Sequence, residues 1–172
     1  AFAENTPFRL FKHYNHEGGI STPLIAHWPQ GITAKNELRQ QPGHLIDIMA
    51  TCVDVGGAKY PNELAGEKIK PMQGASLQPA FKGKSLKREQ PICWEHEGNR
   101  AIRDGKWKLV ANENQPWELY DISNDRSELH DLSATNSKKA AELAAKWEAW
   151  AARSNVLPLG AWRAQAKGGR SE

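Results

Sequence analysis

The sequence predicts an α/β chain whose second half is an α+β unit, in which a small antiparallel sheet packs on a long helix near the carboxy terminus. Three observations predict this class. A short apolar run at residues 24–28 is typical of a buried strand. Three runs rich in β-forming residues follow one another between residues 91 and 121. Residues 137–153 carry apolar side chains at helical spacing.

The first half of the chain predicts one strand and one helix. The apolar run at 24–28 ends at Pro29, and its lack of polar alternation is typical of a strand in a parallel sheet. Residues 44–55 predict an amphipathic helix that ends at Gly56. The apolar face of this helix consists of Leu45, Ile48, Met49, Cys52 and Val55. One strand and one helix cannot bury both faces of a sheet, so we expect residues 1–57 to complete a larger α/β domain.

The segment 58–90 is rich in proline and glycine and has few apolar anchors, which predicts a long surface connection. Residues 91–172 then predict a carboxy-terminal subdomain. Its β-rich runs cover residues 91–94, 100–110 and 117–121. The pair Asp104-Gly105 is a hairpin signal inside the second run, so we expect an antiparallel meander. The helix at about 137–153 closes this sheet.

Composition and charge argue against several classes of function. The chain has 23 Lys and Arg against 20 Asp and Glu, so its net charge is only +3. We therefore expect no nucleic-acid partner. No stretch approaches the roughly 18 apolar residues that span a bilayer. The first twenty residues carry several charges and no export signal, and residues 167–172 form a polar tail that we expect to fray. The chain begins without methionine, and we expect it to be part of a longer protein.

The two cysteines, Cys52 and Cys93, lie in apolar surroundings and lack the Cys-x-x-Cys spacing of zinc and redox sites. We expect two buried thiols, with a single disulfide as the alternative.

The densest polar cluster directly precedes the predicted strand. Its sequence is Lys12-His13-Tyr14-Asn15-His16-Glu17-Gly18-Gly19. A lysine ammonium suits an anionic oxygen, and glycine lets the backbone approach a ligand closely. The residues alone also fit a solvated loop in which Glu17 pairs with a neighbour. His13 and His16 have the spacing of a metal pair on a helix, but no further ligand stands at a recognisable spacing, so we expect no metal site in this chain.

A second polar cluster lies between two β-rich runs. Its sequence is Trp94-Glu95-His96-Glu97-Gly98-Asn99-Arg100. These groups could bind a polar or anionic substrate or serve acid–base chemistry, and they also fit a hairpin connection with surface charges. The sequence contains no nucleophile elbow and no phosphate-binding glycine loop.

Five collinear segments of the chain resemble the late catalytic domain and the carboxy-terminal region of type I sulfatases, and arylsulfatases in particular. The segments are residues 5–29, 44–51, 74–77, 94–109 and 117–121. The resemblance implies an alkaline-phosphatase-like fold, in which residues 1–57 hold the last strand and helix of the large domain. It also implies hydrolysis of sulfate esters with the help of a formylglycine and a calcium ion. Neither Cys52 nor Cys93 lies in the Cys/Ser-x-Pro-x-Arg motif that becomes formylglycine, so we expect the nucleophile and the calcium site outside this chain.

The resemblance also implies roles for individual residues. Lys12, five residues before Glu17, corresponds to the lysine that contacts the sulfate group in this family. Glu17, Gly18 and Gly19 are expected to support that lysine. His44 and Asp47 are expected to cap and orient the helix at 44–55. The residues expected to contact substrate from the carboxy-terminal subdomain are His96, Asn99 and Arg100.

Our first hypothesis is therefore the carboxy-terminal fragment of an arylsulfatase-like sulfuric ester hydrolase, inactive by itself. Its expected partners are a sulfate ester and the preceding part of the same protein, and the family implies a periplasmic or secreted location. The alternative is a stand-alone, non-catalytic binding module. A phosphatase or phosphodiesterase is less favoured, because His96 and His130 have no partner at metal-ligand spacing. We also expect the isolated chain to self-associate through apolar surface.

Overall fold

The computed structural model describes residues 3–160 of the chain, which form two units. One unit combines the residues up to Thr22 with those from Gln90 onward, and the other is Pro23–Glu89. The polar cluster around Lys12 therefore belongs with the sheet of the second half, whereas the sequence grouped it with the helix at 44–55. The polar tail expected at 167–172 lies outside the described residues.

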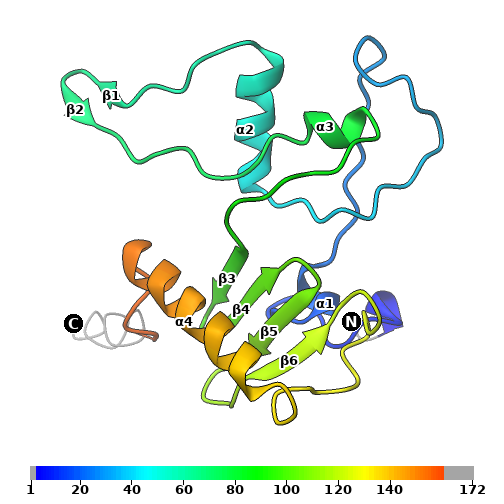
Figure 1. The fold of residues 1–172 in the computed structure, drawn as a ribbon, viewed down its shortest axis with the longest axis vertical. Coiled ribbons are helices and arrows are strands. Elements are labelled where there is room, and N and C mark those ends of the chain that lie inside the picture. Colours follow the sequence, from blue (N-terminus) through cyan, green and yellow to red (C-terminus); the bar gives the residue numbers. More distant parts are fainter. Residues whose placement is uncertain (1–2, 161–172) are drawn as a thin grey trace, which may run out of the picture. The chain divides into compact units, whose positions relative to one another are not determined.

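The first unit is built on a four-stranded antiparallel sheet in the order β3-β4-β5-β6 (Figure 1). The strands are β3 (Ile92–His96), β4 (Asn99–Asp104), β5 (Trp107–Ala111) and β6 (Glu118–Asp121). Asp104 pairs with Trp107, so a hairpin turn follows Asp104 as predicted, and its two loop residues are Gly105 and Lys106. Glu97 and Gly98 join β3 to β4. Both have positive φ, as the two central residues of a type I′ hairpin turn require. The predicted meander is confirmed.

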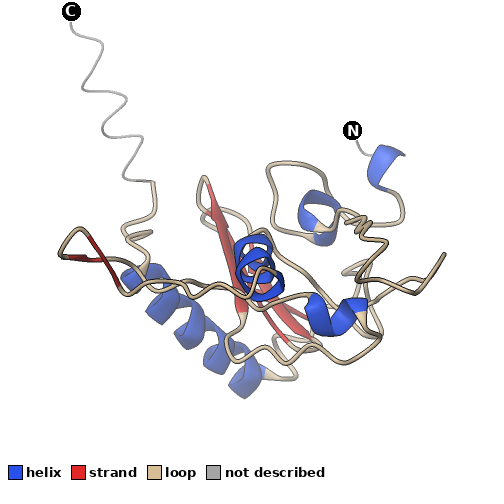
Figure 2. Cartoon of the chain, turned by 90° about the horizontal axis from the view of Figure 1, so that it is seen from above, coloured by secondary structure: helices blue, strands red, loops and turns tan. Residues whose placement is uncertain are grey.

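Helix α4 (Ser137–Arg153) packs on one face of this sheet (Figure 2). The core between helix and sheet consists of Cys93, Ile102, Leu109, Leu119, Leu143, Trp147 and Ala151. The indole Nε1 of Trp147 donates a hydrogen bond of 3.0 Å to the carbonyl of Trp94, which satisfies its polar atom inside an apolar core. The predicted helix and its packing on the sheet are confirmed.

The opposite face of the sheet carries a second core with buried charge. Its apolar members are Ala101, Val110, Tyr120 and Ile122. Lys108 lies on the same face, because side chains alternate along β5 and Leu109 points to α4. The 3-10 helix η1 (Ala3–Asn5) and α1 (Glu17–Ile20) belong to this unit. Glu17, at the start of α1, pairs with Lys108 on that face.

The second unit contains α2 (Ile46–Val55), a hairpin of β1 (Glu63–Leu64) with β2 (Glu67–Lys68), and α3 (Gln78–Phe81). The helix predicted at 44–55 is present over Ile46–Val55 and ends before Gly56 as expected, but its predicted apolar face is largely exposed. The hairpin and α3 fall in the segment 58–90, which the sequence predicted only as a connection. No helix among the described residues is long and apolar enough to cross a membrane.

Two expectations for this part of the chain were wrong. Residues 24–28 form no strand, and Leu24 and Ile25 are 60% and 88% exposed. A strand exists through hydrogen bonds to a neighbouring strand, and no described residue of this unit pairs with the run. Cys52 is exposed rather than buried, because the apolar face of α2 is uncovered within its unit. Cys93 is buried as expected, burial raises its pKa to about 12, and both thiols are free.

Candidate functional site

Residues 8–20, called the lysine segment below, fold back on themselves so closely that two positions require glycine. The amide of Gly18 donates a hydrogen bond of 2.9 Å to the carbonyl of Arg9. A Cβ atom at Gly18 would overlap the Leu10 carbonyl, and one at Gly19 would overlap the Tyr14 carbonyl. Any larger residue would displace the backbone on both sides of Lys12. The two glycines therefore act through close backbone packing.

A buried cluster of charges ties the carboxy-terminal end of the lysine segment to the sheet. The Lys108 ammonium is fully buried and lies 2.9 Å from Glu17 Oε1 and 2.8 Å from Glu128 Oε1. The amide of Glu17 also donates a hydrogen bond of 2.7 Å to Glu128 Oε2. Burial raises the pKa of Glu17, but the attraction and hydrogen bond of Lys108, together with the attraction of Arg103 and Arg126, lower it more, so the net shift is downward. Glu17 is thus held as a carboxylate inside the protein.

A second cluster fixes both ends of the lysine segment to β6. Glu118 accepts hydrogen bonds from Arg9 Nη1 at 2.8 Å and from the Tyr120 hydroxyl at 2.7 Å. His16 Nε2 lies 3.1 Å from the same carboxylate oxygen. Because Arg9 and His16 flank Lys12 on either side, the stretch between them is anchored at both ends.

The Glu118 cluster predicts an acid-dependent loss of stability. Burial raises the pKa of Glu118, but the hydrogen bonds from His16, Tyr120 and Arg9 lower it more, to about 2 from 4.5. The stabilisation is therefore present above about pH 4.5 and is lost as the pH falls towards 2. The shift corresponds to about 3 kcal/mol in the free energy of unfolding. Urea titrations followed by tryptophan fluorescence at several pH values measure this dependence.

The variant Glu118→Gln isolates the effect of that carboxylate. Its deficit in the free energy of unfolding against wild type should be largest at neutral pH and should shrink towards pH 2. Glu148→Gln removes the same charge from an exposed position on α4 and serves as the control. A deficit of Glu118→Gln that stays constant with pH would contradict the assignment.

Lys12 itself is exposed and has no hydrogen bond or ion pair among the described residues. Its neighbours in sequence are held firmly while its own ammonium is free to meet an anion. An unpaired, exposed ammonium on an anchored backbone is the arrangement that suits recognition of an anionic oxygen.

Asn99 connects the lysine segment with the β3–β4 hairpin. Its side chain is buried, and Nδ2 donates hydrogen bonds of 3.2 Å to the carbonyl of His13 and 3.0 Å to that of His96. Its Oδ1 accepts from the amide of Glu113 at 3.2 Å, and its carbonyl accepts from Asn15 Nδ2 at 2.8 Å. The structure thus places Asn99 as a positioning residue between two backbones, with its polar atoms already paired.

The other two residues expected to contact substrate are separated by the sheet. His96 pairs with Asn99, and Glu95 pairs with Arg100, so His96 and Arg100 point to opposite faces. The Arg100 guanidinium lies 4.5 Å from the ring centre of Trp117 and 5.9 Å from that of Trp147, on the side of α4. Of the two, only His96 shares a face with the lysine segment.

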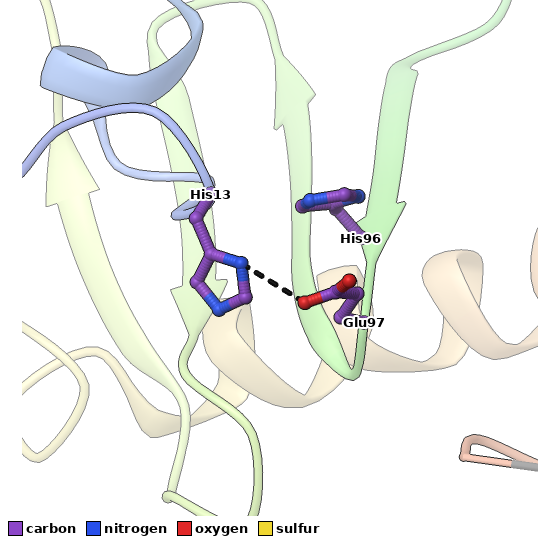
Figure 3. A group of neighbouring side chains, drawn as sticks. All are labelled: His13, His96 and Glu97. Atoms are coloured by element: carbon purple, nitrogen blue, oxygen red, sulfur yellow. Dashed lines mark ion pairs between the residues drawn. The ribbon is translucent and has the colours of Figure 1, made fainter. Parts of the chain in front are cut away.

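His96 meets His13 and Glu97 at the tip of the hairpin (Figure 3). Each of the three side chains offers one potential metal-ligand atom, and these atoms lie within 4.8 Å of one another. His13 Nδ1 is 3.0 Å from Glu97 Oε2, and the two histidine rings meet edge to face with centres 5.3 Å apart. The sequence associated His13 with His16 instead, but His16 is buried against Glu118. No sequence signal links His13 with His96, because they lie on separate elements far apart in the chain.

In the second unit, Asp47 holds the start of α2. Its carboxylate accepts hydrogen bonds of 2.8 Å from the amides of His44 and Ala75 and pairs with Arg88 at 2.5 Å. His44 Nδ1 accepts a longer one, 3.4 Å, from the amide of Ile46. Burial lowers the pKa of His44. Burial raises the pKa of Asp47, but its hydrogen bonds, first of all the one from Arg88, lower it more, so the net shift is downward. The structure thus supplies the contacts for the orienting role expected of both residues.

Comparisons with known proteins place these features among relatives. Residues 8–153 match the family model described as N-sulphoglucosamine sulphohydrolase, C-terminal. A sulfatase of Formosa agariphila is 30% identical over 179 residues, which cover 92% of this chain and 32% of the relative. A choline-sulfatase of Rhizobium meliloti is 31% identical over 130 residues, which cover 72% of this chain and 23% of the relative.

A solved structure has a similar fold. The crystal structure of Ps i-CgsB has a TM-score of 0.71 and 30% sequence identity, covering 85% of this chain and 32% of that one. The chain thus spans about a third, or less, of the length of the proteins that it matches.

Proposed function

The chain belongs to the family of N-sulphoglucosamine sulphohydrolase carboxy-terminal regions, and from this we propose that it is the carboxy-terminal part of a sulfatase that hydrolyses sulfate monoesters in its full-length form. The observation that carries the proposal is the match over residues 8–153, which includes the anchored lysine segment. Sulfatases similar to this chain extend well beyond the matched part, so the complete reaction belongs to the longer protein.

In this proposal Lys12 contacts the sulfate group. Negative charge builds on the sulfuryl and bridging oxygens as the ester bond breaks, and a positioned ammonium stabilises that charge. Glu17, Gly18 and Gly19 support the lysine through the contacts described above, and His96 contacts the substrate from the hairpin. Asn99 holds the backbones of His13 and His96 in place. Arg100 lies on the opposite face of the sheet, against Trp117 and Trp147.

We place the calcium ion and the formylglycine of the full-length enzyme outside this chain. Calcium takes six to eight oxygen ligands, mainly carboxylates and carbonyls. The one group of three potential ligands among the described residues holds two imidazoles and a single carboxylate, so it does not fit calcium. No cysteine here lies in the motif that yields formylglycine. In this proposal the residues of this chain bind and orient the substrate.

The test uses the full-length protein and a pair of substrates that share one leaving group. We expect turnover of an aryl sulfate to exceed that of the corresponding aryl phosphate. Measured initial rates of release of the phenolate give both values under the same conditions. Sulfate-ester turnover no faster than the uncatalysed reaction would reject the proposal and favour a non-catalytic binding module.

We also propose that the isolated chain self-associates. The proposal is supported by α2, whose residues Met49 and Val55 are 58% and 38% exposed, and by Leu45, which is 84% exposed at its start. Exposed apolar surface of this kind drives association. Sedimentation velocity over a range of concentrations is the measurement, and Met49→Glu should shift the distribution towards monomer. A single monomeric species of the wild-type chain at every concentration would contradict the proposal.

A further inference from the structure

The cluster of His13, His96 and Glu97 has the ligand types of a transition-metal site. Two imidazoles with one carboxylate form a recurrent set of protein ligands for Zn²⁺, and three such ligands leave a fourth position open. The described residues bring the three ligand atoms within 4.8 Å of one another. We propose that His13, His96 and Glu97 bind a divalent first-row transition cation of the Zn²⁺ type.

The spacing of the three side chains is close to what such an ion requires. Bonds of about 2.0–2.2 Å in a tetrahedral site place neighbouring ligand atoms about 3.4 Å apart. His13 Nδ1 and Glu97 Oε2 are already 3.0 Å apart. Their side chains are 44% and 43% exposed, so rotation about side-chain bonds meets little resistance from packing. Figure 3 shows the three side chains converging from the lysine segment and the hairpin.

The backbone beneath the cluster is held in place before any ion binds. The buried Asn99 amide donates hydrogen bonds to the carbonyls of both His13 and His96. His13 has a φ of 99° and Glu97 a φ of 51°, in the region that favours glycine and asparagine. The hairpin requires the second of these angles, whereas the first is a strained conformation that the surrounding contacts maintain. Prior ordering of this kind reduces the entropy lost on binding.

The ion pair of His13 with Glu97 does not by itself explain why the His96 side chain lies beside it. Among the described residues, the ring nitrogens of His96 have no hydrogen bond and no ion pair, and the ring meets His13 only edge to face. His96 therefore keeps a ring nitrogen available beside an existing histidine–carboxylate pair. A cation there would connect the lysine segment to the hairpin, on the face of the sheet that carries Lys108.

The experiment titrates ZnCl₂ into the full-length protein after removal of metals by a chelator, with calorimetric detection. The test variants are His96→Ala, Glu97→Gln and His13→Asn, the last chosen because asparagine tolerates positive φ. Each should weaken Zn²⁺ binding at one site by about tenfold or more. His130→Ala is the matched control, because His130 is an exposed histidine 3.6 Å from Asp125. It should leave Zn²⁺ binding unchanged.

Two further readouts make the result decisive. Co²⁺ bound to the wild type should give the visible absorption of a tetrahedral site, and His96→Ala should lose it. Titration with CaCl₂ should give the same affinity in all variants, because calcium prefers oxygen ligands. Zn²⁺ affinity and stoichiometry that are equal in wild type, His96→Ala and His13→Asn would overturn the proposal and leave an ion pair only. Circular dichroism confirms that each variant is folded before titration, and these side chains are exposed enough for the substitutions to be tolerated.

Discussion

Replacement of Lys12 by alanine in the full-length protein is expected to lower kcat for sulfate-ester hydrolysis by about 10² to 10³ while leaving stability almost unchanged. The large kinetic effect follows because the ammonium stabilises charge that develops mainly in the transition state, which lowers kcat more than it changes KM. The small effect on stability follows because Lys12 is exposed and unpaired among the described residues. Steady-state kinetics on an aryl sulfate, together with the thermal unfolding midpoint, measure the two quantities.

Two variants sharpen the Lys12 experiment. Lys12→Arg keeps the charge with different geometry and should recover part of the lost turnover. Lys138→Ala removes an exposed lysine on α4 and should leave kcat unchanged. Activity of Lys12→Ala within twofold of wild type would remove Lys12 from the site, even if the protein proves to be a sulfatase.

The carboxy-terminal half of the fold could be predicted from sequence because its signals are local. The helical spacing of apolar residues in α4 depends on residues within that one helix. The turn signal Asp104-Gly105 depends on residues within one hairpin. The antiparallel sheet then follows from the succession of strands. Residues 24–28 show the limit of such reasoning, because a strand depends on a partner that the run itself does not encode.

The candidate site could be predicted only in part, because its contacts join distant parts of the chain. Lys12 was identified because the segment around it resembles sulfatases, and the spacing of residues alone did not single it out. The environment of Lys108 had a weak local signal, since a lysine between Trp107 and Leu109 must point to the opposite face of the strand. Its partners Glu17 and Glu128 had no such signal.

Replacement of Lys108 by methionine is expected to destabilise the sheet unit by about 3–5 kcal/mol. Methionine fills a similar volume, so the loss comes from charge: Glu17 and Glu128 would remain buried without the ammonium that lies 2.9 and 2.8 Å from them. Hydrogen exchange of the amides in β4 and β5 measures the effect in the full-length protein. Protection of these amides should fall by about two to four orders of magnitude.

Lys146→Met is the matched control for this experiment, because Lys146 also lies between two carboxylates. Its ammonium is 2.7 Å from Asp104 Oδ2 and 2.8 Å from Glu142 Oε1, but the side chain is 41% exposed. Water and salt screen such a pair, so exchange in β4 and β5 should change far less. Equal losses in both variants would mean that burial does not matter and that Lys108 acts as an ordinary surface lysine. Recovery of protection in a Lys108→Met, Glu17→Gln, Glu128→Gln triple variant would show that unpaired buried charge causes the loss, because the two carboxylates that lose their partner are then neutral.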